Sequence, residues 1–338
     1  MGSGSDGVSQ PTGRVRPVLC WAAALALFVL ALLAGRYPVP GFMDPRLAAE
    51  DELARTILLN VRLPRALAAA LLGAVLAASG NAFQMVFSNP LVESGFLGVS
   101  QGAAFGAALV MVLGFRHDLA VSAGAFCFAL AGLGASSALA RRFRFGGWVL
   151  RLVLSGIVVS AFFSAALGWV KYAADPLREL PDIAYWTLGG LSGMGWKRLS
   201  VVAPVALVSL AVLRAAGWRL SILSLDDTAS FSLGARPGRE RALILAAAVA
   251  GVAAMTAVSG IVSWAGLIVP HAARLLAGAD GRRSMPVSIA LGAAFLLVCD
   301  AASRSLLPGE LPLGVTTAFL GTAGFTALLL GRAVTVVR

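Results

Sequence analysis

Residues able to perform acid–base or nucleophilic chemistry are few and scattered in this chain. The two histidines, His117 and His271, are far apart, and neither belongs to an H-E-x-x-H metal-binding motif. Asp300 has no second acid at a spacing suited to paired-carboxylate catalysis. The three cysteines show no paired metal-ligand spacing. We therefore expect no catalytic residue and no metal site in this chain.

A nucleotide-binding motif is also missing. No G-x-x-x-x-G-K-[ST] stretch occurs in the sequence, and this is the loop whose backbone N–H groups would cradle phosphates. The chain is expected to bind no cofactor of its own. If its work consumes energy, ATP and Mg²⁺ are expected on a separate ATPase subunit.

Composition predicts a membrane protein. Of the 338 residues, 59% are hydrophobic and only 13% are charged, and the mean hydropathy is +0.86. A helix needs about 20 apolar residues to cross the bilayer, and suitable stretches recur along the whole chain. We predict an all-α polytopic fold, with a disordered cytosolic tail over 1–16 and a single transmembrane domain over 17–338. Its ten or so spans are expected near 17–35, 66–87, 92–114, 119–140, 149–171, 198–216, 240–260, 262–277, 285–303 and 312–331.

Charge predicts the orientation. With the N-terminus in the cytosol, 16 of the 27 lysines and arginines and six of the 16 acids fall on the inner face. Both termini are then cytosolic, and the net charge of +11 is explained by an inner face that meets membrane lipid. No nucleic-acid partner is needed to explain it.

Three arginines do not fit the positive-inside rule. Arg62 and Arg65, in "RLPR", are expected at the outer end of one span, and Arg304 is expected at the outer end of another. Single outer arginines commonly reach toward lipid headgroups. Three that converge on a nearly neutral face favour a site where a partner docks.

The inner loop over 217–239 predicts a short helix. Asp226 and Asp227 precede "TASFSLG", which reads as an acidic helix start followed by one or two turns and a glycine stop at Gly234. Such a helix can press into a cleft on a partner and transmit its movement. A solvated surface helix is the alternative.

Polar and small residues within the predicted spans mark a candidate translocation path. These are Gly80, Gln84, Ser100 and Gln101, which face either a water-filled path or neighbouring helices. Between two spans on the inner side, Asn89-Pro90-Leu91 interrupts the chain, because proline disfavours helical geometry in the residue before it.

Four motifs in sequence order resemble one family. "RLPRALAAALLGAVLAASGNAFQMVFSNPLVESGFLGVSQGAAFGA", "LDDTASFSLGA", "GLIVPHAARLLAGADGRRSMPVS" and "DAASRSLLPGELPLGVTTAFLG" are similar to FecCD-type permeases of ABC importers for iron siderophores, haem and cobalamin. The resemblance covers nearly the whole chain. It implies a homodimer of ten-helix subunits, two cytosolic ATP-binding cassette subunits and a periplasmic or extracytoplasmic substrate-binding protein.

The resemblance also implies roles for the motif residues. It assigns Arg62, Arg65 and Arg304 to docking of the binding protein, and the Asn89-Pro90-Leu91 corner to a cytoplasmic gate. Ser94 departs from the family pattern, which usually has proline there. Coupling to the ATPase falls on Asp226, Asp227, Thr228, Ala229, Leu233 and Gly234.

The expected function is a multi-pass permease of the inner membrane that imports an iron chelate, either a siderophore or haem. Cobalamin or an oxyanion is the alternative cargo within the same family. An intramembrane enzyme or an ion channel is the alternative from another class. The sequence disfavours a channel, since it contains no repeated carbonyl or acidic filter motif.

Overall fold

The computed structural model describes residues 17–330, apart from 38, 116 and 308. The tail predicted over 1–16 lies outside the described residues. The elements of the first third of the chain are α1 (Pro17–Leu33), β1 (Ala34–Gly35), β2 (Gly41–Phe42), α2 (Leu47–Glu50), α3 (Glu52–Thr56), the π-helical turn η1 (Ile57–Arg62), α4 (Leu63–Val86), the 3₁₀ turn η2 (Ser94–Leu97) and α5 (Val99–Val112). The elements that follow are α6 (Asp118–Arg142), α7 (Trp148–Ala173), α8 (Glu179–Leu188), α9 (Trp196–Ala215), α10 (Gly217–Leu223), α11 (Asp227–Ser232), α12 (Pro237–Ser259), α13 (Ala265–Ala277), α14 (Gly281–Ser305) and α15 (Leu313–Leu330).

The all-α prediction is confirmed. Within the described residues, seven helices are long and apolar enough to cross a membrane, the first of them the continuous run of α3, η1 and α4. Three shorter apolar helices, α1, α5 and α13, complete the set. Together they match the predicted spans, most of them to within a few residues. The described strands β1 and β2 form only a small antiparallel pair.

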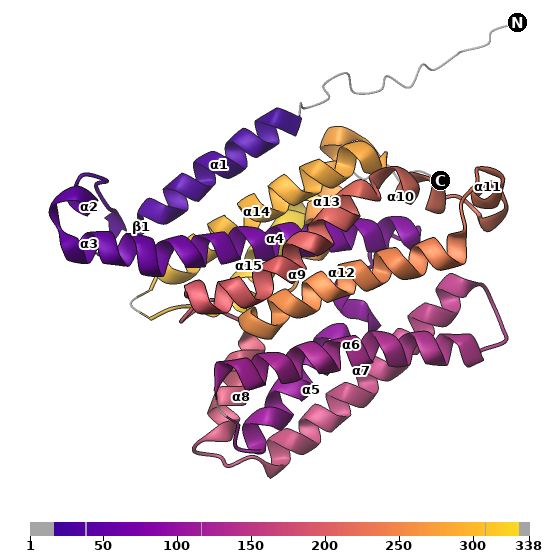
Figure 1. The fold of residues 1–338 in the computed structure, drawn as a ribbon, viewed down its shortest axis with the longest axis horizontal. Coiled ribbons are helices and arrows are strands. Elements are labelled where there is room, and N and C mark those ends of the chain that lie inside the picture. Colours follow the sequence, from indigo (N-terminus) through magenta and orange to yellow (C-terminus); the bar gives the residue numbers. More distant parts are fainter. Residues whose placement is uncertain (1–16, 38, 116, 308, 331–338) are drawn as a thin grey trace, which may run out of the picture.

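Helix α4 is the centre of the bundle. It packs against α14, α12, α13 and α9, and nearly all of its residues are buried. Helices α5, α6 and α7 form a second group, with α8 beside them, and α12 joins this group to the first by packing on α6 (Figure 1). We call the end of the bundle with α10 and α11 the α11 end, and the opposite end the α8 end.

Glycines allow the central helices to approach closely. A Cβ atom at Gly73 of α4 would lie 2.0 Å from the carbonyl oxygen of Gly292 on α14. One at Gly80 would lie 1.9 Å from the carbonyl oxygen of Gly266 on α13. Small residues at such positions bring helix backbones into direct contact, which is how membrane helices commonly associate.

Pro64 lies inside a continuous helical run rather than at its start. The helix already starts at Glu52, where the Asp51 carboxylate accepts a hydrogen bond of 3.0 Å from the N–H of Leu53. The π-helical turn η1 lies just before Pro64, and its widened turn accommodates the residue that has no N–H to donate. The hydroxyl of Tyr37 also donates to Asp51, which lowers the pKa of Asp51 and raises that of Tyr37.

Two of the short helices begin partway along the bundle. Helix α5 follows η2, and Gly98 between them packs on Val159 in the middle of α7. Helix α13 begins beside the last two turns of α4, where Gly80 and Gln84 contact Gly266, after a break at residues 260–264. In this break Trp264 adopts a left-handed backbone conformation with φ of 73°. This conformation is unfavourable for a residue other than glycine, so contacts around Trp264 must stabilise it.

We expect Gly73→Ala to destabilise the protein. The added methyl group meets the Gly292 backbone, and overpacking of this kind costs about 1–3 kcal/mol. Gly134→Ala is the matched control, because nothing lies within 4 Å of a Cβ atom there and alanine favours the helix. Thermal unfolding in detergent should show a lower midpoint for Gly73→Ala alone. Equal midpoints for the two variants would contradict the packing described.

Candidate functional site

The short helix predicted in the inner loop is present as α11. The Asp226 carboxylate caps its start by accepting a hydrogen bond of 2.6 Å from the N–H of Ala229. Its end is followed by Gly234, whose φ of 78° is readily adopted by glycine. Phe231 and Leu233 are 70% and 58% exposed. The helix therefore presents an apolar tip at the α11 end of the bundle.

Arg241 of α12 ties this helix to the bundle. Its guanidinium donates to the Asp227 carboxylate at 2.5 Å and to the carbonyl oxygen of Leu223 at 2.9 Å. The arginine is buried, and it thereby joins the end of α10 to the start of α11. The hydroxyl of Ser230 adds a 2.8 Å bond to the carbonyl oxygen of Ile222. Helix α11 is thus held firmly from behind while its tip stays exposed.

A row of aromatic rings continues from Arg241 to α4. The guanidinium lies over the Trp148 ring, 5.5 Å from its centroid, which is a cation–π geometry. Trp148 stacks on Phe87 at 5.8 Å, and Phe87 stacks on Phe83 at 5.7 Å. Phe87 is the C-cap of α4, immediately before the interruption predicted from the sequence. The contacts therefore run without a gap from α11 to the end of α4.

The Asn89-Pro90-Leu91 corner lies at the same end as α11. The preceding residue, Ser88, has φ of 47°, and its hydroxyl donates a 3.2 Å hydrogen bond to the carbonyl oxygen of Ser224. The Asn89 side chain accepts from the N–H of Leu91 at 2.9 Å, which fixes the turn around Pro90. The structure thus joins the corner to the segment between α10 and α11. Its role as a gate stays a prediction.

Arg65 and Arg304, two of the three arginines predicted to converge, lie around Asp300, and Arg62 lies near Arg304. Arg65 donates to Asp300 at 2.8 Å and to Glu310 at 2.7 Å. The Nε atom of Arg304 lies 3.1 Å from the second Asp300 oxygen. Asp300 is fully buried, whereas the Glu310 side chain is 41% exposed. The cluster is thus sealed on one side and reaches solvent through Glu310.

Arg62 and Arg65 are buried and the Arg304 side chain is 9% exposed, so the arginines are not presented on a rim as the sequence suggested. Arg62 donates to the carbonyl oxygens of Leu32 and Leu33 at 3.2 and 3.0 Å. Arg304 donates to the carbonyl oxygens of Ala34, at 3.0 Å, and Ala31. The last carbonyls of a helix lack internal partners and carry partial negative charge, so α1 attracts both guanidinium groups. Docking of a partner at this cluster stays a prediction.

The four candidate path residues separate into two sites. Gln84 bonds the carbonyl oxygens of Gly266 and Leu267 at 3.3 and 3.1 Å, and Gly80 packs on the same segment. Both are therefore part of the contact between α4 and α13. Ser100 and Gln101 instead line a cavity of about 410 Å³ between the two helix groups. Their role in translocation also stays a prediction.

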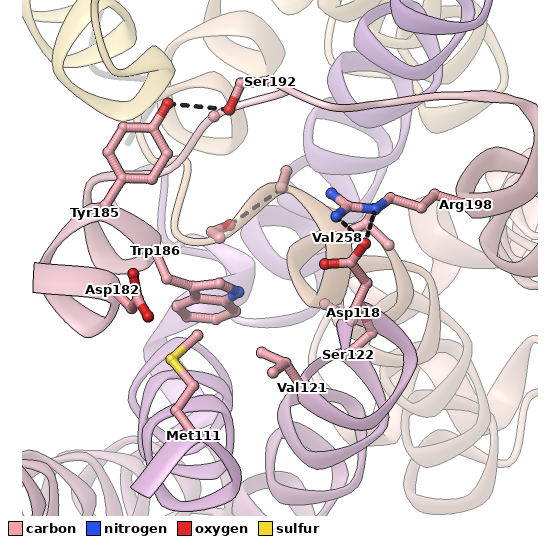
Figure 2. Close-up of a pocket in the computed structure, with 14 residues that line it drawn as sticks. Met111, Asp118, Val121, Ser122, Asp182, Tyr185, Trp186, Ser192, Arg198 and Val258 are labelled. Carbon is pink, nitrogen blue, oxygen red and sulfur yellow. Dashed lines mark hydrogen bonds and ion pairs between the residues drawn. The ribbon is translucent and has the colours of Figure 1, made fainter. Parts of the chain in front are cut away.

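A second cavity, of about 390 Å³, lies at the α8 end (Figure 2). Arg198 of α9 pairs with Asp118 of α6 across its wall, with Nε and Oδ2 2.9 Å apart. Tyr185 of α8 and Ser192 are joined by a 3.0 Å hydrogen bond between their hydroxyls. Helix α8 falls in the gap between the predicted spans near 149–171 and 198–216, so it was not expected. The acidic residues of its first turn were the available signal.

We expect Asp300→Asn to destabilise the protein strongly. The change leaves two buried arginines without their shared countercharge, and breaking buried pairs costs about 3–5 kcal/mol. Glu310→Gln is the control, and its half-exposed carboxylate should contribute only about 0.2–1 kcal/mol. Thermal unfolding of both variants in detergent measures the difference. Equal destabilisation would argue against Asp300 as the centre of the cluster.

Comparison with known proteins supplies the family. The FecCD transport family model matches residues 23–331. The hemin transport system permease HmuU of Yersinia pestis is 34% identical, with 94% of this chain and 97% of HmuU covered. The Fe(3+) dicitrate permease FecC of Escherichia coli is 33% identical, with coverage of 95% and 99%. The molybdate permease MolB of Haemophilus influenzae is 34% identical, with 82% of each chain covered.

A solved structure agrees in fold. A metal-chelate type ABC transporter in an inward-facing conformation superposes with a TM-score of 0.86 at 30% identity, covering 94% of this chain and all of that one. The relatives are permease subunits, and the family separates the permease from the ATPase. This chain is therefore not an enzyme. It belongs to the FecCD transport family and is a multi-pass membrane permease subunit of an ABC importer.

Proposed function

We propose that the protein imports an iron chelate, a siderophore or haem, across the inner membrane. Supporting this cargo are the haem and ferric dicitrate permeases among the relatives and the metal-chelate transporter among the solved structures. Cobalamin and molybdate are the alternatives, since permeases for both are equally similar in sequence. Uptake of iron-55 siderophore and of radioactive molybdate by the complete transporter decides between them. Molybdate uptake without iron uptake would overturn the proposed cargo.

The α11 end is proposed to face the cytosol. Lysines and arginines predominate among the charges there, as the positive-inside rule requires of cytoplasmic loops. Both chain termini then lie on the same side. Two copies of the permease would carry two ATPase subunits at this end, and the substrate-binding protein would dock at the α8 end.

The observation that carries the proposal is the link between α11 and the end of α4. The exposed Phe231 and Leu233 would insert into a cleft of the ATPase, as apolar side chains do in helix-in-groove recognition. Movement of α11 would then pass through Arg241 to Trp148 and the end of α4. The corner at 89–91 would widen or narrow the path in response.

Docking of the binding protein is proposed at the arginine cluster. Glu310 is the partly exposed carboxylate bonded to Arg65, so it occupies the place that an acidic residue of the partner would take. Docking would exchange one carboxylate for another without leaving Arg65 unpaired. This route is compatible with the burial of the arginines, because only Glu310 has to move.

We expect Leu233→Ser to uncouple ATP hydrolysis from transport. The change removes an exposed apolar contact without touching the buried anchor of α11, so the protein should still fold. Iron-55 siderophore uptake by the complete transporter should fall about tenfold while hydrolysis continues. Leu243→Ser on α12 is the control, since this leucine is equally exposed but lies outside α11. Unchanged uptake in Leu233→Ser would contradict the proposed coupling helix.

We expect Arg241→Gln to disconnect the corner from α11. The shorter, neutral side chain loses both the ion pair with Asp227 and the cation–π contact with Trp148. Thiol labelling of Leu91→Cys should depend on nucleotide in the complete transporter and lose that dependence in the double variant. Arg282→Gln is the control, because Arg282 lies at the same 5.5 Å over a different ring, Trp218. Persistent nucleotide dependence with Arg241→Gln would refute this route.

A further inference from the structure

The cavity between the two helix groups contains an acidic residue that the proposed function has not used. The cavity is lined by Leu76, in the middle of α4, and by Ile157, in the middle of α7. The short helices α5 and α13 both begin at its wall. Its polar lining consists of Glu93, Ser100, Gln101, Ser160, Thr256 and Ser263.

Glu93 is not neutralised by a basic residue. No lysine, arginine or histidine is among the described residues that line the cavity, and no ion pair of Glu93 occurs among them. The backbone N–H of Trp264 lies near the Glu93 carboxylate. A Cβ atom at Gly95 would lie 2.5 Å from the Ser100 hydroxyl and 3.8 Å from the Glu93 carboxylate, so these two groups share the same small space.

A carboxylate at this depth is costly, and such residues commonly mark substrate pathways. The starts of α5 and α13 supply partial positive charge, which offsets part of the cost of burying an ionised Glu93. The remaining lining adds hydroxyl groups and an amide. The cavity therefore holds one acidic residue, no basic residue among its described lining, and many hydrogen-bond acceptors.

We propose that Glu93, with the hydroxyl groups around it, forms a binding site on the translocation path that accepts positively charged or hydrogen-bond-donating groups of the cargo. This inference rests on the proposed importer function and narrows its substrate class. A chelate bearing ammonium, amide or hydroxyl groups finds acceptors in the cavity. An oxyanion such as molybdate meets a like charge and is disfavoured.

A purely structural role for Glu93 makes a different prediction. The Trp264 backbone is strained, and it is also held by the Phe325 ring at 6.4 Å and by packing on Gly321. If the role of Glu93 were only to hold the Trp264 backbone, Glu93→Gln would preserve that role, because the amide oxygen of glutamine also accepts a hydrogen bond. The natural protein and the Glu93→Gln variant would then rank differently charged chelates by affinity in the same order.

The test uses one ferric chelate in three charge states. Iron-55 ferrioxamine B is singly positive, its N-acetyl derivative is neutral, and its N-succinyl derivative is singly negative. Equilibrium binding is measured on the full chain in lipid nanodiscs. For the natural protein we expect affinity to fall about tenfold from the positive to the negative chelate. Glu93→Gln should abolish this order, and Glu93→Asp should retain it.

Asp182→Asn is the matched control, since it removes an acid from the cavity at the α8 end and should leave the order unchanged. The proposal is overturned if Glu93→Gln keeps the charge order of the natural protein, or if no chelate of the series binds the natural protein. ATP-driven uptake by the complete transporter is measured separately. Failed iron uptake with an intact charge order would sink the proposed function and leave the cavity site standing.

Discussion

The structure depends on one constraint: polar groups in the interior of an apolar bundle have no water to pair with, so side chains must satisfy them. Helices that end or begin inside the bundle expose backbone carbonyls and N–H groups there. Arg62 and Arg304 bond carbonyls in the last turn of α1. Gln84 bonds the carbonyl oxygen of Gly266 in α13, whose partner four residues later is Pro270, which has no N–H. These bonds fix the helix ends that surround the central helix α4.

The need to pair buried polar groups also distinguishes the fixed Asp300 cluster from the exposed tip of α11. Around Asp300 every buried charge has a partner, which makes the cluster a fixed anchor with one exposed carboxylate at Glu310. At the opposite end, α11 is anchored by Arg241 but presents an apolar tip. In the proposed coupling, a force on that tip would pass to Arg241 and to the rings packed on it. Glu93 stands apart because no basic residue among the described lining of its cavity balances it.

Much of this could be predicted from the sequence. The spans followed from apolar length, and α11 followed from the Asp226 cap and the Gly234 stop, because both signals are local. Burial of Arg62 could not be predicted, since its partners are carbonyls about thirty residues earlier in the chain. The position of Glu93 could not be predicted either, because its place at the wall of a cavity depends on the break before α13.

The central claim is that α11 and the corner at 89–91 move as one unit. Pulsed electron–electron resonance between spin labels at Leu233→Cys and Leu91→Cys, each also paired with a label on the fixed α14, measures this directly in the complete transporter. The account predicts that nucleotide binding shifts both labels relative to α14 and that Arg241→Gln stops the shift at position 91 alone. A shift of α11 with a stationary corner in the otherwise natural protein would contradict it.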